Sequence, residues 1–285
     1  MSRIVLLDGA VGTSLWEKAE AAGIDKVVVW RYNIEHPELV TSLTKDYIDA
    51  GSEIVLTNTF GANGPAVKRS SSYDAAEVVR KGVAATKAAT EGTGVKTCLA
   101  VGPVSMLLEP YGDLEEDECR EIYDNMIGAG MEEKPDCIFV QTFFDLAMLK
   151  IAAEAARQYD VPVFAALSFE KIGKTIMGNS VEDMIKELEP LGLAAIGMNC
   201  SIGPDQAVPI IKEFSEKTDI PLIFKPNAGK PISSSDGTFA SAYTAEMFAS
   251  EVAPALKYVT YVGGCCGSNP EYIRELKKYI AKETD

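Results

Sequence analysis

The chain alternates between short apolar runs and longer segments in which apolar residues recur every three or four positions. Eight of the apolar runs have the length and composition of buried strands, and each is bounded by turn-forming or charged residues. These runs are Ile4–Asp8, Glu53–Thr57, Thr97–Val101, Cys137–Gln141, Val161–Ala166, Ala195–Asn199, Leu222–Pro226 and Tyr258–Val262. Continuous apolar runs are typical of parallel strands that are covered on both faces.

The segments between these runs have the periodicity of helices, and several begin with a recognisable start signal. Ser180 precedes one of them, and Pro204 and Pro270 stand at the first position of two others. The predicted helices are Pro37–Ala50, Tyr73–Thr90, Leu114–Met131, Asp145–Tyr159, Val181–Leu188, Pro204–Glu216, Thr244–Val252 and Pro270–Ala281.

Eight strand–helix units without a linker or a break in composition predict an α/β fold, a single (β/α)8 TIM barrel that spans residues 1–285 as one domain. A doubly wound open sheet is the alternative. It is disfavoured because no Gly-x-Gly-x-x-Gly follows a strand, and no Gly-x-x-x-x-Gly-Lys-Ser/Thr occurs in the sequence.

Composition narrows the class of protein further. With 285 residues, of which 47% are hydrophobic, the chain is able to bury a large core. A net charge of −15 disfavours nucleic acid and anionic membranes as partners. There is no apolar stretch of about 20 residues and no basic-then-apolar leader, so we expect a cytoplasmic protein with no membrane partner.

Six cysteines and one histidine limit the available chemistry. In a cytosolic chain of this size, six cysteines indicate free thiols or a metal site and not a disulfide framework. The histidine, His36, lies in a polar run at a predicted helix start, where such residues are usually solvated. The sequence therefore disfavours catalysis by a histidine acid, base or triad.

Three of the cysteines follow predicted strands. Cys200 comes directly after the sixth strand, and Cys265 and Cys266 follow the eighth within Gly263-Gly-Cys-Cys-Gly267. Loops after the carboxyl ends of barrel strands share one rim, so the three thiols are expected to meet there. Adjacent cysteines do not easily form a disulfide, but three thiolates suit an open, catalytic zinc site. The alternative is three buried, apolar cysteines.

The remaining cysteines are expected to have packing or surface roles. Cys98 and Cys137 lie inside predicted strands, and Cys119 lies in an acidic predicted helix. None of the three follows a strand end, so none is predicted to lie on the rim with the others.

The loop after the first strand, Asp8-Gly-Ala-Val-Gly-Thr13, is a candidate anion site. Gly9 and Gly12 allow backbone N–H groups to approach a carboxylate next to a helix start. A plain strand-ending turn is the alternative. Asn58 and Thr59, after the second strand, either orient a substrate or only satisfy backbone groups on the rim.

Several motifs together are similar to those of the homocysteine S-methyltransferase domain family. The chain resembles most of all the N-terminal homocysteine-binding barrel of cobalamin-dependent methionine synthase, and the matching pieces run nearly from end to end. They are Leu6-Leu-Asp-Gly-Ala-Val-Gly-Thr13, Glu35-His-Pro-Glu38, Thr57-Asn-Thr-Phe-Gly-Ala62, Gly102-Pro-Val104, Leu108-Glu-Pro-Tyr-Gly-Asp113, Asn199-Cys-Ser-Ile-Gly-Pro204, Pro226-Asn-Ala-Gly229 and Gly263-Gly-Cys-Cys-Gly267.

The resemblance implies a Zn²⁺ ion held by Cys200, Cys265 and Cys266, which activates the thiol of homocysteine by direct coordination. It also implies that Asn227 fills the fourth metal position when substrate is absent. The amino-acid carboxylate is expected at the backbone of Ala10 and Val11, with Asp8 beside it.

The implied activity is a zinc-dependent homocysteine or thiol S-methyltransferase that forms methionine or another thioether. Zinc deprotonates a bound thiol, so no general base is needed. The bound sulfur is expected to attack an electrophilic methyl group in an in-line displacement.

One position departs from the family pattern. The family usually ends the fourth strand with a glutamate that pairs with the substrate's α-amino group, but this chain has Gln141. The neutral amide lacks the charge-assisted contribution, typically about 1–2 kcal/mol. Either the affinity for homocysteine is reduced, or the true thiol lacks that amino group. Lys225 and Lys230 either favour a more anionic ligand or are solvated.

The methyl donor is left open by the sequence. No Asp-x-His-x-x-Gly pattern for cobalamin ligation is present, so cobalamin is expected only on a separate partner protein. The first hypothesis is transfer from a methylcorrinoid protein or a methylfolate-derived donor. The second is a small onium donor, such as S-methylmethionine or betaine, or the reverse demethylation. The third is a catalytically silent zinc- or thiol-binding module.

Overall fold

The computed structural model describes residues 3–228, 232–233, 239–240 and 243–284. Eight strands form one parallel sheet in the order β1-β10-β7-β6-β5-β4-β3-β2, as the sequence predicts. A parallel bridge between Leu7 and Ile54 joins the two ends of this order and closes the barrel. The strands are β1 (Val5–Leu6), β2 (Ile54–Leu56), β3 (Lys96–Val101), β4 (Cys137–Phe143), β5 (Val163–Leu167), β6 (Ala195–Asn199), β7 (Leu222–Lys225) and β10 (Tyr261–Val262).

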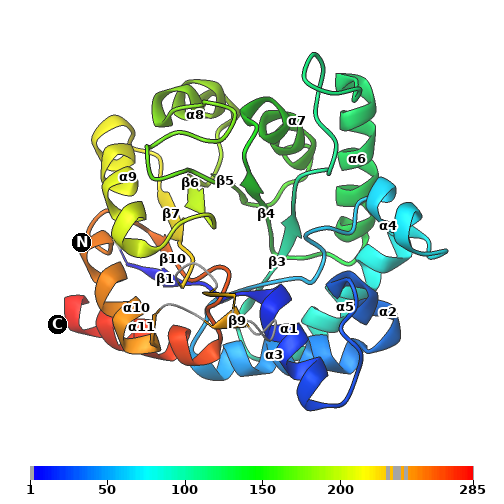
Figure 1. Cartoon of the computed structure of the whole chain (residues 1–285), viewed down its shortest axis with the longest axis horizontal. Helices are drawn as coiled ribbons and strands as arrows, with labels where there is room; N and C mark the ends of the chain where they lie inside the picture. Colours follow the sequence, from blue (N-terminus) through cyan, green and yellow to red (C-terminus); the bar gives the residue numbers. More distant parts are fainter. Residues whose placement is uncertain (1–2, 229–231, 234–238, 241–242, 285) are drawn as a thin grey trace.

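The helices form a ring around the sheet (Figure 1). Each predicted helix is present, with ends that shift by a few residues. The helices are α1 (Val11–Ala21), α2 (Tyr32–Glu35), α3 (Pro37–Ala50), α4 (Gly64–Ser70), α5 (Ala75–Thr90), α6 (Glu116–Glu132), α7 (Leu146–Ala156), α8 (Val181–Leu188), α9 (Pro204–Lys217), α10 (Ala245–Val252) and α11 (Pro270–Thr284).

The core has two layers, which explains why the strands are apolar on both faces. An inner cluster fills the barrel and includes Leu7, Phe139 and Ile223. A larger outer cluster lies between the strands and the helices. Cys98 and Cys137 belong to the inner cluster and Cys119, on α6, to the outer one, so the packing role expected for these three is confirmed.

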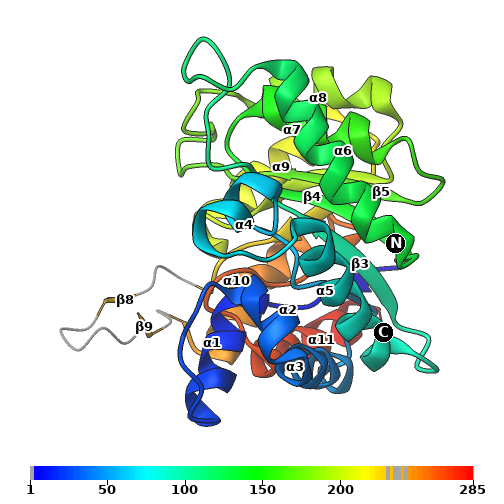
Figure 2. The same ribbon diagram turned by 90° about the vertical axis from the view of Figure 1, so that its right-hand side faces the viewer.

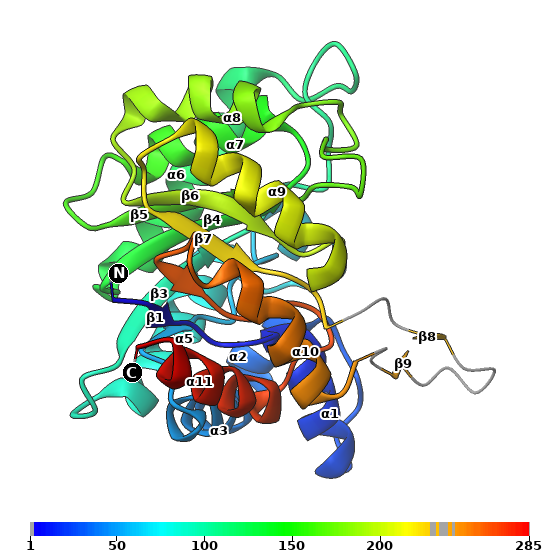
Figure 3. The ribbon, with the colours of Figure 1, turned by 90° about the vertical axis from the view of Figure 1, so that its left-hand side faces the viewer.

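Figures 2 and 3 show the barrel from two sides, with β8 (Ile232–Ser233) and β9 (Phe239–Ala240) extending away from it beyond α1 and α10. These two strands pair in antiparallel register and were not predicted. Lys230 and Gly229 lie outside the described residues. Among the described helices, none has the length and apolar character needed to cross a membrane.

Candidate metal centre

Three cysteine sulfurs meet at the carboxyl ends of β6 and β10. The Sγ atoms of Cys200, Cys265 and Cys266 all lie within 4.8 Å of one another, and Cys200 and Cys266 are 3.7 Å apart. Two thiolates bound to one tetrahedral zinc at about 2.3 Å lie roughly 3.8 Å apart, so the observed spacing fits a shared ion. In the part of the chain that the structure describes, this is the one group of metal-ligating side chains found.

The backbone at Cys200 adopts an uncommon conformation. Cys200 has φ 64° and Ser201 has φ 60°, both in the left-handed region that L-residues rarely occupy. The Cys200 N–H donates to the carbonyl of Lys225 at 3.0 Å, and the N–H of Ile202 donates to the carbonyl of Cys200 at 2.8 Å. Strained residues of this kind cluster at functional sites, where surrounding contacts hold them.

The loop that carries the other two cysteines is anchored on its neighbours. Cys265 donates its N–H to the carbonyl of Pro226 at 2.8 Å, and the carbonyl of Cys266 accepts from Ala228 at 2.9 Å. The turn packs tightly, because a Cβ on Gly264 would lie 2.3 Å from Ser268 Oγ. Only glycine fits there, which accounts for the glycine before the cysteine pair.

Without a cation, the hydrogen bonds among the three sulfurs favour ionisation of Cys200 over that of Cys265 and Cys266. Hydrogen bonds from Cys265 and Cys266 lower the pKa of Cys200 to about 3. The bond to Cys200 in turn raises the pKa of Cys265, and raises that of Cys266 to about 12. A divalent cation would offset two of the three negative charges and allow all three thiols to ionise.

The side-chain amide of Asn227 lies beside Cys200. This amide is one of the contacts that lower the pKa of Cys200, so it lies within hydrogen-bond reach of that sulfur. Its Oδ1 is buried and has no hydrogen-bond partner among the described residues. An orphaned buried oxygen costs free energy unless something occupies it, and a metal ion is a partner that suits it. The residues present therefore fit a zinc ion.

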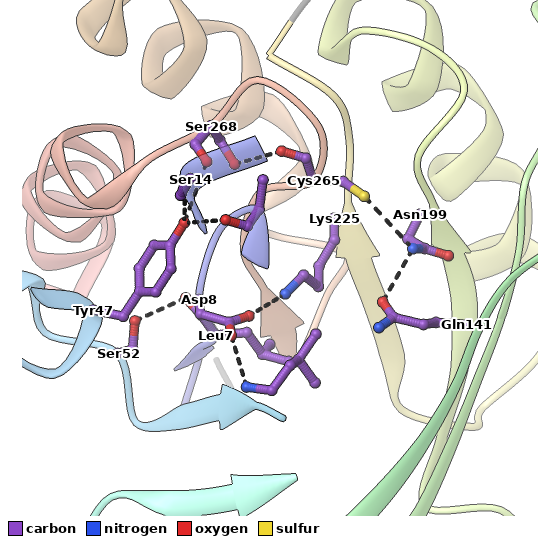
Figure 4. Close-up of polar contacts among 12 residues, drawn as sticks. Leu7, Asp8, Ser14, Tyr47, Ser52, Gln141, Asn199, Lys225, Cys265 and Ser268 are labelled. Carbon is purple, nitrogen blue, oxygen red and sulfur yellow. Dashed lines mark hydrogen bonds and ion pairs between the residues drawn. The ribbon is translucent and has the colours of Figure 1, made fainter. Parts of the chain in front are cut away.

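Asn199, the last residue of β6, connects the sulfurs with Gln141. Its Nδ2 lies 3.8 Å from Cys265 Sγ, 2.6 Å from Thr142 Oγ1 and 3.3 Å from Gln141 Oε1, and its Oδ1 accepts from the Thr142 N–H at 2.8 Å. Figure 4 shows this amide between the cysteine and the glutamine. Thr142 has φ 64°, so the asparagine also holds a left-handed residue.

A cavity of about 260 Å³ opens beside the cysteines. Such a volume suits a small ligand of roughly amino-acid size. The described residues that line it come from several loops on the carboxyl side of the strands, and they include Ala10, Val11, Gly12, Asn58, Gln141, Lys225 and all three cysteines.

The start of α1 forms one wall of this cavity. No side chain caps the helix at Ala10 among the described residues. The N–H of Ala10 donates to the Ser268 carbonyl at 3.0 Å, and its carbonyl accepts from Tyr47 Oη at 2.8 Å. The backbone N–H of Ala10 is therefore already engaged. The N–H groups of the first helical turn, from Val11 onward, remain available to bind an anion.

Asp8 lies behind this wall in a buried ion pair. Its Oδ1 is 2.5 Å from Lys225 Nζ, its Oδ2 accepts from the Leu56 N–H at 2.7 Å, and both charged side chains are 1% exposed (Figure 4). Of the two alternatives left open for Lys225, the solvated one is wrong, because Lys225 is buried and pairs with Asp8. Asp8 itself is not among the residues that line the cavity, whereas Lys225 is.

The rim asparagine Asn58 has a structural role. Its Nδ2 donates to the carbonyl of Val29 and to Asn33 Oδ1, each at 2.8 Å. Thr59, fully buried, donates to the carbonyl of Ala100 at 2.7 Å. Both side chains satisfy polar groups on the rim, and Asn58 also lines the cavity.

A larger groove of about 720 Å³ lies between α6, α7 and α8. Its charged residues include Lys150 and Glu187, which pair with each other at 2.8 Å. None of the three clustered cysteines lines this groove, whereas all three line the smaller cavity. The candidate metal site therefore opens into the smaller cavity.

Sequence reasoning missed Asn199 and Thr142 as parts of the site, and it missed the pairing of Asp8 with Lys225. A signal existed for Asn199, since a polar residue at the end of an apolar strand needs a partner when buried. No comparable signal marks Tyr47, which is fully buried on α3 and belongs to the helix's apolar face in the sequence.

This chain resembles known proteins in sequence and in structure. The family model described as homocysteine S-methyltransferase matches residues 5–280. Methionine synthase of Mycobacterium tuberculosis is 28% identical over 308 residues, which cover 98% of this chain and 25% of that protein. Methionine synthase of Mycobacterium leprae is also 28% identical, over 99% of this chain and 25% of that protein. The chain thus spans about a quarter of the length of these relatives.

Solved structures share the fold. The oxidized form of the homocysteine methyltransferase MmuM from Escherichia coli has a TM-score of 0.80 at 20% identity, covering 96% of this chain and 95% of that one. Its metallated form has a TM-score of 0.79 at 20% identity, with 96% of both chains covered. The structural likeness confirms the (β/α)8 barrel, and the match of the family model over residues 5–280 shows that the chain belongs to the homocysteine S-methyltransferase family.

Proposed function

We propose that this protein is a zinc-dependent S-methyltransferase that methylates homocysteine or a related small thiol. The observation that carries the proposal is the cluster of Cys200, Cys265 and Cys266, with the buried, unpartnered Oδ1 of Asn227 available as a fourth, replaceable ligand. Structural zinc sites are closed by four firm ligands, whereas catalytic sites keep one exchangeable position.

Zinc, when bound by the three cysteines, supplies deprotonation of a coordinated substrate thiol at neutral pH. The chain's own residues supply position. Asn199 holds Cys265 by its amide, and the first turn of α1 presents N–H groups for a substrate carboxylate. The cavity between these two points fixes the distance between sulfur and carboxylate that a substrate must have.

Methyl transfer then needs no basic side chain. A thiolate sulfur forms a bond to the methyl carbon, and the electron pair of the broken bond leaves with the donor. Consistent with this, the single histidine is not among the residues that line the cavity. His36 instead precedes the first turn of α3 and contacts Glu38 at 3.1 Å.

Exposed apolar residues on the rim support a donor carried by a protein. Ile172 and Ile176, in the loop after β5, are each 74% exposed, and Tyr111, in the loop after β3, is 72% exposed. Phe60 and Leu107 are exposed on the loops after β2 and β3. All five stand on loops that follow the carboxyl ends of strands, the side of the barrel that carries the cavity, and exposed apolar side chains are typical of protein interaction sites. A methylcorrinoid protein or domain fits this face, and methionine synthases are relatives in sequence.

The test is a methyl-transfer assay with homocysteine and zinc-loaded protein, using methylcob(III)alamin, S-methylmethionine and betaine as separate donors. We expect loss of cobalamin methyl absorbance with the first donor and none after chelation of zinc. A Cys265→Ser variant should behave as the chelated protein, and Cys119→Ser, which changes a cysteine outside the cluster, should keep activity. Turnover with S-methylmethionine or betaine and none with methylcob(III)alamin would show that the donor is an onium compound and not a corrinoid. Equal turnover without zinc would overturn the proposal.

A further inference from the structure

The hydrogen bonds around Gln141 fix which end of its amide faces the cavity. The Thr142 N–H can only donate, so the atom of Asn199 that it contacts at 2.8 Å must be the oxygen Oδ1. The Asn199 nitrogen then faces Gln141 at 3.3 Å, and the contacted atom of Gln141 must be its oxygen Oε1. The orientation of both amides thus follows from one backbone donor.

The nitrogen of Gln141 is consequently the end that remains for a ligand. In Figure 4 the amide oxygen points to Asn199, and Nε2 lies on the opposite side. Gln141 is 6% exposed, lines the cavity, and donates no hydrogen bond from Nε2 to any described residue. An N–H donor on the cavity wall that has no partner among the described residues is free to donate to whatever occupies the cavity.

No free carboxylate faces this donor from the described cavity wall. The charged residues on that wall are Lys225 and the cysteines, and the carboxylate nearest to Lys225, that of Asp8, already accepts from Lys225 and from the Leu56 N–H. A ligand ammonium placed beside Gln141 would meet an N–H donor and no carboxylate on the described wall. Desolvating an ammonium with no such partner is costly.

We infer that the preferred thiol of this protein is a mercaptocarboxylate that carries no amino group. The inference rests on the proposed zinc–thiol function and names its substrate class. The carboxylate lies against the N–H groups at the start of α1, the sulfur lies at the three cysteines, and Gln141 Nε2 donates to an oxygen of the ligand. Gln141 is therefore the specificity-determining residue of the cavity.

The test compares two thiols of equal length that differ in the amino group alone. L-homocysteine and 4-mercaptobutanoate are titrated calorimetrically into zinc-loaded wild-type protein, and into metal-free protein to confirm that binding needs zinc. We expect 4-mercaptobutanoate to bind about tenfold more tightly or better, the ratio that one lost charge-assisted contact produces. Equal binding, or tighter binding of homocysteine, would overturn the inference.

A charge-restoring variant sharpens the comparison. Gln141→Glu keeps an oxygen for Asn199 and presents a carboxylate to the cavity, so it should shift the preference toward homocysteine by about tenfold or more. Gln158→Glu, at an exposed position just after α7 and beside Asp124, is the control and should leave the wild-type ratio unchanged. A Gln141→Glu protein with the wild-type ratio contradicts the inference.

The outcomes also separate this inference from the function on which it rests. If neither thiol binds the zinc-loaded protein more tightly than the metal-free protein, the zinc–thiol function is wrong and the inference falls with it. If both bind through zinc but homocysteine is preferred, only the inference is wrong. The wild-type titrations alone decide between these cases, so the conclusion does not depend on the folding of a variant.

Discussion

Lys225 and Asp8 form a buried ion pair at the cavity, and Lys225 is the member that lines it. The two charges come from β7 and the end of β1, they lie 2.5 Å apart, and each is 1% exposed. Removal of one member of a buried pair leaves the other charged and unpartnered, which costs far more than loss of a surface pair. The pair therefore fixes both the electrostatics and the stability of this region.

Lys225→Met should lower the free energy of unfolding by about 3–5 kcal/mol, because Asp8 is left without its cation. Urea denaturation followed by circular dichroism measures this loss. The double variant Asp8→Asn, Lys225→Met should recover much of it, since no isolated charge remains. Lys150→Met, which breaks an exposed pair with Glu187, is the control and should change stability far less. A single variant as stable as wild type would contradict the role of the pair.

The cysteine cluster was predictable from sequence and the lysine partner was not. Cys200 and Cys265 each follow a strand end, and a barrel brings those ends to one rim whatever the details of packing. Lys225 also stands at a strand end, but its environment depends on Asp8, 217 positions earlier. A lysine at the end of a strand is expected to be solvated unless that long-range partner is known.

At the scale of elements, prediction succeeded where burial imposes a clear pattern. All eight barrel strands are surrounded by two apolar layers, so each appears in the sequence as a continuous apolar run. Helix α1 was missed because its buried positions are Ser14, Leu15 and Ala19, of which only one is a large apolar residue. The β8–β9 pair consists of two-residue strands, too short for any periodicity.

Strand β6 positions two parts of the site, Asn199 at its end and Cys200 just after it, so its contact with β7 has a functional consequence. A Cβ on Gly197 would lie 2.0 Å from the Ile223 carbonyl oxygen, which is backbone and cannot move aside easily. Gly197→Ala should therefore push the strands apart.

We expect Gly197→Ala to cost about 1–3 kcal/mol of stability, as overpacking does, and also to weaken zinc binding because Cys200 moves away from Cys265. Zinc affinity is measured by competition with a chromophoric chelator. Gly128→Ala on α6 is the matched control, since its Cβ would lie 3.4 Å from Tyr159 Oη, an ordinary contact. Unchanged zinc affinity in Gly197→Ala would show that β6 does not set the cysteine geometry.

At the scale of the whole molecule, the three cysteines come from segments that are distant in sequence but close in the barrel. Cys200 follows β6 and Cys265 follows β10, and β7 lies between these strands in the sheet. An ion held by both loops exists only when the barrel is folded, so its binding free energy adds to the stability of the folded state. The centre is thus expected to act as a clasp across β6, β7 and β10 as well as a catalytic site.

Zinc should therefore raise the melting temperature of the entire barrel. A free zinc concentration about 1,000 times the dissociation constant stabilises the folded state by about 4 kcal/mol, which for a domain of this size corresponds to roughly 5–10 °C. Differential scanning calorimetry of metal-free and zinc-loaded protein measures the shift. Cys265→Ser should lose it, because serine oxygen replaces a thiolate ligand, whereas Cys119→Ser, a change on α6 away from the cluster, should retain it. A shift of equal size in Cys265→Ser would mean that zinc stabilises the protein from another site. It would contradict the prediction that the three-cysteine site holds β6, β7 and β10 together.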